Sequence, residues 1–298
     1  MHKIYLPIIT LQQSSLKSSF ARHGIRFGFA VGGSSFENPI TRRLIEQHAS
    51  IVATENALKM EYTQPYEGVF NFTKADDILR YSNELNIGVY GHALSWSLQN
   101  PHWLNTGEFT AEQLEVILKQ HVSALAARYG SACIALDAAN EGFVSKGAWA
   151  PMGNDYINVS LEYARHDCPV IYNSFFPSQS EYWQALVLLD AGKIDAIGIQ
   201  LHLHYTDWEY QLRRTEAFLQ TIRNRGGWAR FSEVGVLAPE PLQSTIYKET
   251  TKLALKYKDI VRDFVVWGIK DPAWRGDVTL FDKDGIPKPA YWAVMDAL

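Results

Sequence analysis

The chain has 298 residues, of which 47% are hydrophobic and 20% are charged, and its formal net charge at pH 7 is −4. This length suits one α/β barrel or two smaller domains, and the composition is that of an ordinary globular protein with a large core. The negative charge argues against nucleic acid as a partner, because a nucleic-acid-binding surface requires a basic face.

The chain carries no clear targeting signal. No apolar run is long enough to span a bilayer, so no membrane partner is expected. The first residues, MHKIYLPIITLQQSS, lack a charged region followed by an apolar one and a small-residue cleavage site. We therefore expect a secreted protein if a leader has been removed, and a cytoplasmic one otherwise. The two cysteines, Cys133 and Cys168, are expected to be buried free thiols, although a disulfide between them is conceivable.

Short apolar runs alternate with longer helical patterns along the chain. The predicted strands are RFGFAV (26–31), SIVAT (50–54), IGVYGH (87–92), CIALDAAN (133–140), PVIYNS (169–174), AIGIQLH (196–202), ARFSE (229–233) and FVVWGI (264–269). The predicted helices include residues 76–86, 111–129, 156–164, 181–190, 209–225 and 241–257. Thr110 and Gln113 form a capping-box pattern at the start of the second of these helices.

Eight strands that alternate with helices predict an α/β protein with a single (β/α)8 TIM barrel over residues 1–298. Residues 1–23 would form an N-terminal lead-in helix or segment. A doubly wound open sheet is the alternative. It is less favoured because no Gly-rich phosphate turn follows the first strand; GFAVGGSSF is only superficially similar.

Polar and aromatic residues gather just after the predicted strands, at the end where α/β barrels hold their active sites. In chain order they are Glu55, Asn56, Lys59, His92, Trp96, Asn140, Glu141, Asn173, Gln200, His202, Glu233, Trp267, Asp271 and Trp274. Packing alone does not readily explain such clustering. Lys59 stands one helical turn after Glu55 and is either a ligand-binding donor or an ordinary surface lysine.

Glu141 and Glu233 are the candidate catalytic pair, since each carboxyl group ends a predicted strand. Two such groups facing one glycosidic bond supply an acid and a nucleophile. Glu141 follows a buried strand, so desolvation would raise its pKa and suit it to act as the acid and later the base. Separations of about 5–5.5 Å and about 6.5–9.5 Å would indicate retention and inversion, respectively. For either glutamate taken alone, a solvated loop acid or an ion-pair partner is as good an interpretation as a catalytic group.

The segment QLHLHY supports a rival hypothesis. His202 and His204 are two residues apart, so on a strand both side chains point the same way, as a metal pair would. With His92 they would give a metal-dependent hydrolase. No further cluster at ligand spacing completes that site, so we favour a site without metal and expect no cofactor.

Several long, ordered motifs resemble glycoside hydrolase family 10, the endo-β-1,4-xylanases, from about Gly24 to the C-terminus. ATENALKMEYTQPYEGVFNFTKAD is similar to the family's TPENxMKWD segment and its FNF…AD continuation, and GHALSWSLQNPHW to GHTLVWHSQ.P.W. LDAANEGF is similar to WDVVNEAF, and AIGIQLHLH to GIG.Q.H. The C-terminal VVWGIKDPAWRG and LFDKDGIPKPAYWAV are similar to VWG..D..SWR and LLFD….KPAY.

The resemblance implies a role for each candidate residue. Glu141 would be the acid/base and Glu233 the nucleophile of a retaining endo-xylanase. Glu55, Asn56, Lys59, His92, Trp96 and Gln99 would line the non-reducing side of the cleavage point. Asn140, Asn173, Gln200, His202, Trp267 and Trp274 would complete the sugar-binding cleft. We expect a monomer that acts on xylan or xylo-oligosaccharides.

The sequence departs from the family pattern at three positions. Gly235 replaces the Asp of the family's TELD motif, which pairs with the His that orients the nucleophile. His202 is therefore expected to lose a partner, with consequences for its tautomer and for the pKa of Glu233. Ser174 stands where the family's YNDY has an acid, and Leu136 replaces a Trp. Two alternatives stay open: a retaining barrel hydrolase acting on β-glucan or mannan, and a non-catalytic carbohydrate- or protein-binding barrel.

Overall fold

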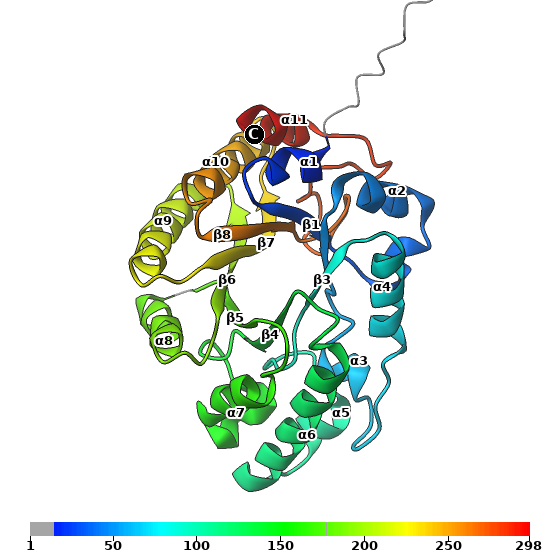
Figure 1. Cartoon of the computed structure of the whole chain (residues 1–298), viewed down its shortest axis with the longest axis vertical. Coiled ribbons are helices and arrows are strands. Elements are labelled where there is room, and N and C mark those ends of the chain that lie inside the picture. The colour runs from blue at the N-terminus through cyan, green and yellow to red at the C-terminus, as the bar shows by residue number, and fades with distance from the viewer. Residues whose placement is uncertain (1–14, 177) are drawn as a thin grey trace, which may run out of the picture.

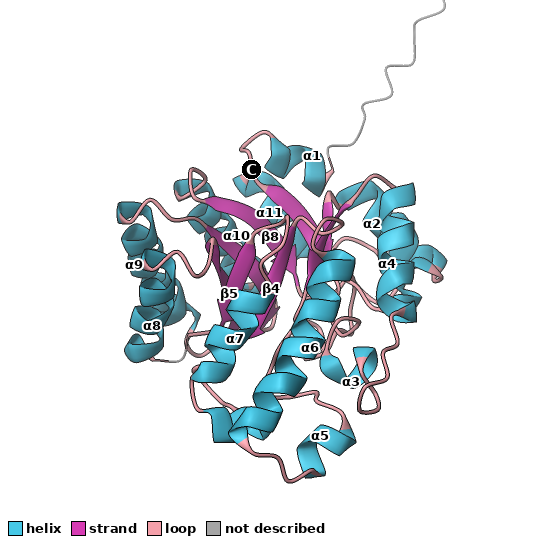
Figure 2. Cartoon of the chain, turned by 60° about the horizontal axis from the view of Figure 1, so that its bottom comes forward, coloured by secondary structure: helices cyan, strands magenta, loops and turns pink. Residues whose placement is uncertain are grey.

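The computed structural model describes residues 15–176 and 178–298. Within them, eight parallel strands close into one barrel, in which each strand pairs with the next and β8 pairs with β1. Figure 1 looks along the barrel and shows the helices as an outer ring; Figure 2, turned by 60°, shows the strands as the inner layer. The predicted (β/α)8 barrel is confirmed, and the alternative of an open doubly wound sheet is wrong.

All eight predicted strands are present, with different ends. They are β1 Arg26–Ala30, β2 Ile51–Ala53, β3 Gly88–Gly91, β4 Ala135–Asn140, β5 Val170–Ser174, β6 Ala196–His204, β7 Ala229–Leu237 and β8 Val261–Val266. The predicted strand for β8 begins three residues late, because Arg262 and Asp263 are charged and interrupt the apolar pattern on which the prediction rests. Asp263 is nevertheless fully buried, since it forms ion pairs inside the barrel.

In the described residues, the six predicted helices each begin within three residues of the predicted position, and five further helices complete the layer around the strands. In chain order, the helices are α1 Leu16–Ala21, α2 Pro39–His48, α3 Met60–Thr63, α4 Thr73–Glu84, α5 His102–Thr106, α6 Ala111–Tyr129, α7 Asp155–Tyr163, α8 Gln179–Asp190, α9 Trp208–Asn224, α10 Leu242–Lys256 and α11 Pro289–Ala297. Two 3-10 segments, η1 Gly33–Phe36 and η2 Gly147–Met152, lie in loops. The predicted capping box is present: the Thr110 side chain accepts from the Gln113 backbone, and the Gln113 side chain accepts in return.

The two ends of the described chain meet beside the barrel. α1 lies near α11 in Figure 1, and the His23 ring is hydrogen-bonded to the Leu298 carbonyl at 2.9 Å. α1 falls within the predicted lead-in of residues 1–23, of which residues 1–14 lie outside the described residues. Cys133 and Cys168 are buried free thiols. In the part of the chain that the structure describes, no helix has both the length and the apolar character needed to cross a bilayer.

Buried charges fill the barrel at the end where the strands begin. Asp263 on β8 accepts from Arg26 on β1 at 2.6 Å and contacts Arg230 on β7 at 2.7 Å. The fully buried Arg230 guanidinium also lies 3.6 Å from the ring centre of Tyr90 on β3. This cluster joins four strands around the barrel axis by charge as well as by backbone pairing.

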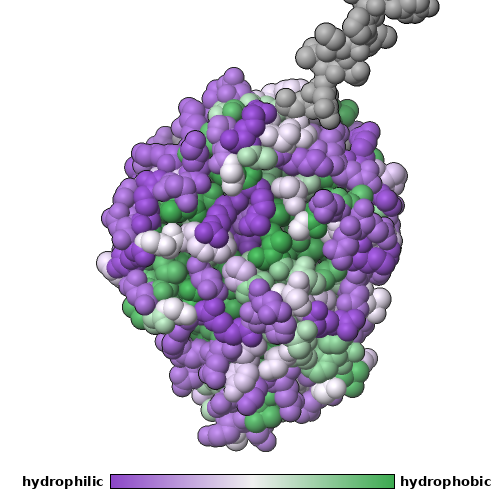
Figure 3. Space-filling model, in the orientation of Figure 1, coloured by the Kyte–Doolittle hydropathy of each residue, from purple (hydrophilic) through white to green (hydrophobic). Residues whose placement is uncertain are grey.

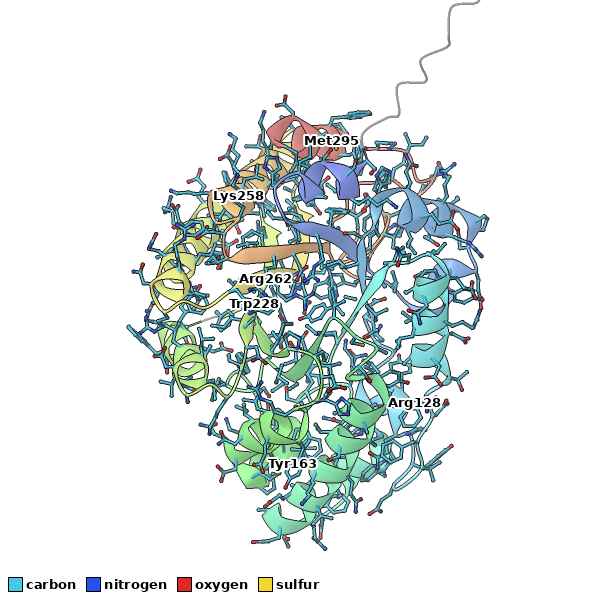
Figure 4. The ribbon with its side chains drawn as sticks, viewed as in Figure 1. Arg128, Tyr163, Trp228, Lys258, Arg262 and Met295 are labelled. Atoms are coloured by element: carbon cyan, nitrogen blue, oxygen red, sulfur yellow. The ribbon has the colours of Figure 1, made fainter. Side chains whose placement is uncertain are left out.

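Aromatic and cationic side chains cover the same end of the barrel. The Arg262 guanidinium stacks 4.2 Å from the Trp228 ring, and both residues lie near the centre of Figure 4. Figure 3, in the same orientation, shows a largely hydrophilic face with hydrophobic residues between the polar ones. The main cleft lies instead where the strands end.

Candidate active site

A cleft of about 560 Å³ opens at the ends of the strands. Its lining includes both candidate carboxyl groups and eleven of the twelve predicted binding residues, namely Glu55, Asn56, Lys59, His92, Trp96, Gln99, Asn140, Gln200, His202, Trp267 and Trp274. Asn173, the twelfth, is fully buried directly beneath the cleft and contacts two of the lining residues. The structure thus brings the predicted residues together at one end of the barrel.

Glu233 is held by three side chains inside the barrel rim. Its carboxylate accepts from Asn173 Nδ2 at 2.8 Å and is hydrogen-bonded to His202 Nε2 at 3.0 Å. The His92 ring lies 3.9 Å from it. Burial raises the pKa of Glu233, but His202, His92 and Asn173 together outweigh burial and hold it below its ordinary value. Glu233 is therefore ionised at neutral pH, as a nucleophile must be.

Glu141 lies at the end of β4 and is half-buried. Its backbone has a φ of +52°, a left-handed conformation that is uncommon for a residue other than glycine. The carboxyl group accepts from Gln200 Nε2 at 2.9 Å and from Trp96 Nε1 at 3.2 Å. These donors come from β6 and from the loop after β3, so the position of Glu141 depends on three parts of the barrel.

A chain of side-chain amides connects the two carboxyl groups. Gln200 Nε2 donates to Glu141 and to Asn140 Oδ1, at 2.9 and 3.1 Å. Asn173 Nδ2 donates to Asn140 Oδ1 and to Glu233, at 2.9 and 2.8 Å. Each of these two amide nitrogens thus uses both of its hydrogens. Asn140 Nδ2, which lies 3.5 Å from Glu141, is the donor left for a ligand hydroxyl.

Irregular strand pairing places these polar groups at the rim. Register shifts occur between Ile199 and Gln200 where β6 pairs with β7, and between Phe231 and Val234 where β7 pairs with β8. Such irregularities re-aim side chains, and they are common next to active sites. Here they lie beside Gln200 and Glu233.

A buried acid that the strand-end pattern did not single out supports His92. Asp137, inside β4, contacts His92 Nδ1 at 2.7 Å and accepts a hydrogen bond from Tyr90. Burial is the main reason that the pKa of Asp137 is raised, and His92 opposes that effect. The Trp267 ring packs edge-on against His92, with 5.0 Å between ring centres. The signal in the sequence that could have identified Asp137 is its charge within an otherwise apolar run.

Lys59 is buried in the cleft, so the alternative of an ordinary surface lysine is wrong. Its Nζ donates to Asn56 Oδ1 at 2.9 Å and to Gln99 Oε1 at 2.6 Å, and it lies 4.7 Å from the Trp96 ring centre. Burial lowers its pKa, and Glu233, Glu55 and Glu141 oppose this. The ammonium group thus provides a positive charge on one wall of the cleft.

Some of the other lining residues were not predicted from the strand ends. They include Leu98, Phe175, Tyr182, Leu203, Gln211, Thr215 and Arg275. Asp271, which the strand-end pattern did include, lies elsewhere: it is buried and holds the Thr279 backbone and Lys288 Nζ, at 2.9 and 2.5 Å. It therefore orders the loop after β8.

The histidines of QLHLHY have separate contacts. His202 Nε2 contacts Glu233, and the His202 ring packs edge-on against Trp274 with 4.7 Å between centres. His204 Nδ1 instead contacts Thr206 Oγ1 at 2.7 Å. Among residues 15–176 and 178–298, no three His, Cys, Asp or Glu side chains gather as a metal site would require.

The chain is similar to known glycosidases over nearly its whole length. The family model described as "Glycosyl hydrolase family 10" matches residues 15–297. An endo-1,4-beta-xylanase A from a Caldicellulosiruptor species is 28% identical over 91% of this chain, and this chain spans about half (46%) of that relative. An endo-1,4-beta-xylanase from Geobacillus stearothermophilus is 27% identical, over 95% of this chain and 98% of that protein.

Solved structures agree with the sequence comparison. One is a mutant of an intracellular xylanase from Thermoanaerobacterium saccharolyticum in complex with xylotetraose. It is 26% identical to this chain, with a TM-score of 0.85 over 95% of this chain and 98% of its own. A second mutant structure, in complex with xylotriose, is 25% identical with a TM-score of 0.85, over 95% of this chain and 99% of its own.

Proposed function

The chain belongs to glycosyl hydrolase family 10, and we propose that it is a retaining endo-xylanase that cleaves internal β-1,4-xylosidic bonds. The observation that carries this proposal is a pair of carboxyl groups, one at the end of β4 and one within β7, connected by amides within one cleft. The two relatives described above are xylanases, and solved structures of similar proteins hold xylotriose and xylotetraose.

The proposed reaction has two displacement steps. In the first, a Glu233 oxygen attacks the anomeric carbon as the glycosidic C–O bond breaks, and Glu141 transfers its proton to the leaving oxygen. In the second, Glu141 takes a proton from water, the water oxygen bonds to the anomeric carbon, and Glu233 leaves as a carboxylate. The low pKa of Glu233 suits both its attack and its departure.

The remaining lining residues would bind the sugar chain. Lys59, Asn56 and Gln99 form a hydrogen-bonded polar group on one wall, suited to sugar hydroxyls. Trp274, with 48% of its surface exposed, offers an aromatic platform for the apolar face of a ring. Asn140 Nδ2 is placed to bind a hydroxyl beside the reacting carbon.

The first test is product analysis with xylan, β-glucan and mannan. We expect short xylo-oligosaccharides from the wild type, and a loss of at least about three orders of magnitude in rate for Glu233→Ala. Glu108→Ala, which removes an exposed loop carboxylate, is the matched control and should keep the wild-type rate. Products from β-glucan or mannan alone would reassign the substrate, and no release from any polymer by the folded wild type would contradict the proposed activity.

A second test separates the two carboxyl groups. Glu141→Ala should lose most activity on xylan, yet form the glycosyl-enzyme normally from aryl xylobiosides whose leaving group needs no protonation. Equal loss on both kinds of substrate would exclude Glu141 as the acid. NMR of the first product should show the β-anomer; an initial α-anomer would mean inversion and would exclude Glu233 as a covalent nucleophile.

A further inference from the structure

A second, much smaller cavity lies beside the main cleft. Its volume is about 30 Å³, and its lining comprises His202, Leu203, His204, Gly235, Leu237, Trp274, Arg275 and Val278. Four of these residues, His202, Leu203, Trp274 and Arg275, also line the main cleft and therefore separate the two spaces. A cavity needs about 10–15 Å³ of such volume to hold one water molecule, so this cavity suits a group of a few heavy atoms.

The His202 ring is partnered on one side only. Nε2 contacts Glu233 at 3.0 Å, whereas no described residue forms a hydrogen bond with Nδ1. Gly235 pairs with His202 across β6 and β7, and a Cβ at Gly235 would lie 3.7 Å from Nδ1. Because Gly235 has no side chain, Nδ1 of His202 faces the space that a side chain at position 235 would occupy.

The cavity also has a positive neighbour. Arg275 stacks on Trp274, with its guanidinium 4.1 Å from the ring centre, and no carboxylate in the described chain forms an ion pair with it. His204, the other titratable group in the lining, contacts Thr206. A small anion here would meet Nδ1 of His202 and a free guanidinium.

We propose that the cavity between Gly235, His202 and Arg275 binds a small carboxylate such as formate or acetate. One carboxylate oxygen would accept from His202 Nδ1 and the other from Arg275. His202 would then carry protons on both ring nitrogens and donate to Glu233 at the same time. The bound anion thus favours the imidazolium form of His202 and, through it, the ionised form of Glu233. This catalytic consequence rests on the function proposed above; the binding itself does not.

The first measurement is NMR of the histidine ring nitrogens, with His202→Gln used to assign the resonance. In formate, compared with chloride at equal ionic strength, the pH at which His202 titrates should rise saturably by about one unit, as expected for a new opposite charge close by. An unchanged His202 titration at formate concentrations well above about 1 mM, where even a ligand bound by only about 4 kcal/mol would occupy its site, would overturn the proposal.

Two substitutions of one residue test the position of the site. Gly235→Asp should supply a covalent carboxylate, so His202 should titrate higher without formate and no longer respond to it. Gly235→Ala fills the cavity with an uncharged methyl group at ordinary contact distances. His202 should then no longer respond to formate, and the pH at which it titrates without formate should not rise. A formate response equal to wild type in both folded variants would place the anion elsewhere and refute the proposal.

The pH dependence of xylan cleavage gives the functional readout. Formate should shift the wild-type pH profile and leave that of Gly235→Asp unchanged. If His202 responds in NMR but no polymer is cleaved, the anion site stands and the xylanase proposal fails. If xylan is cleaved and His202 does not respond, only the anion site fails.

Discussion

At the residue scale, a glutamate from α8 takes the place of the acid that family resemblance places at Ser174. Glu181 Oε1 accepts from Ser174 Oγ at 2.6 Å and from Tyr172 Oη at 2.9 Å. Within the described residues its Oε2 has no hydrogen-bond partner. A carboxyl group is therefore kept near the end of β5, although a different element supplies it.

The pKa of Glu181 leads to a prediction about stability. Burial raises this pKa above its ordinary value of 4.5, against the hydrogen bonds from Ser174 and Tyr172. A raised pKa means that folding disfavours the ionised form, so this carboxyl group contributes less to stability as pH rises above about 4.5. The Tm of Glu181→Gln should therefore increase relative to wild type between pH 4.5 and 8.

Glu181→Ala provides the contrast. It leaves the Ser174 and Tyr172 hydroxyls without their acceptor in a buried place, which should cost about 1–3 kcal/mol at every pH. Thermal or urea unfolding across this pH range measures both effects. A Tm difference between Glu181→Gln and wild type that does not vary with pH would show that the buried carboxyl group is not disfavoured when ionised.

The two carboxyl groups proposed as the catalytic pair could be located from sequence, whereas the residues that support them could not. Glu141 follows an apolar run and Glu233 ends a predicted strand of mixed character, so strand prediction alone places both at the barrel rim. Asp137 and Glu181 reach the site from within a strand and from a helix, and their contacts with His92 and Ser174 cross from one element to another. Such contacts depend on strand register and helix docking, which a local pattern does not contain.

At the element scale, strand existence was easier to predict than strand ends. β6 and β7 extend to His204 and Leu237 because they pair with each other over eight residue pairs. The sequence prediction ended at polar side chains, which here lie within the paired region. The helix α2 was not predicted, although Asn38 followed by Pro39 is a helix-start signal, and Asn38 Oδ1 accepts from two backbone amides.

The capping box of α6 permits a prediction confined to one element. Thr110→Ala removes the acceptor for the Gln113 backbone amide, which lies 3.3 Å from the hydroxyl oxygen, and should destabilise the protein by about 1 kcal/mol. Gln120→Ala on the exposed face of the same helix is the control and should change stability little. Urea unfolding measures both, and xylan hydrolysis should be unaffected because neither residue lines the cleft.

A loss no larger for Thr110→Ala than for Gln120→Ala would mean that water replaces the cap at no cost. Such a result would leave the packing of buried residues such as Leu118 and Val122 as the main source of α6 stability.

At the scale of the whole molecule, polar groups run along the barrel from the buried ion cluster to the cleft. Arg230 faces Tyr90, Tyr90 donates to Asp137, Asp137 contacts His92, and His92 lies beside Glu233. Closing the barrel is what brings β3, β4 and β7 together along this line. A rearrangement of the buried ion cluster would therefore alter the contacts that lead to Glu233, without any charge having to move between these groups.

The ion cluster gives the last prediction, an order of destabilisation. Asp263→Asn leaves Arg230 without its only ion-pair partner in the described residues, and an unpaired buried charge costs about 3–5 kcal/mol. Arg230→Met should cost less, because Asp263 keeps Arg26, while Arg26→Ala should cost least, about 1 kcal/mol, since that side chain is 41% exposed. Urea unfolding of the three variants measures the order. A larger loss for Arg230→Met than for Asp263→Asn would show that stacking of the guanidinium on Tyr90, rather than charge pairing across the closing strands, holds this end of the barrel together.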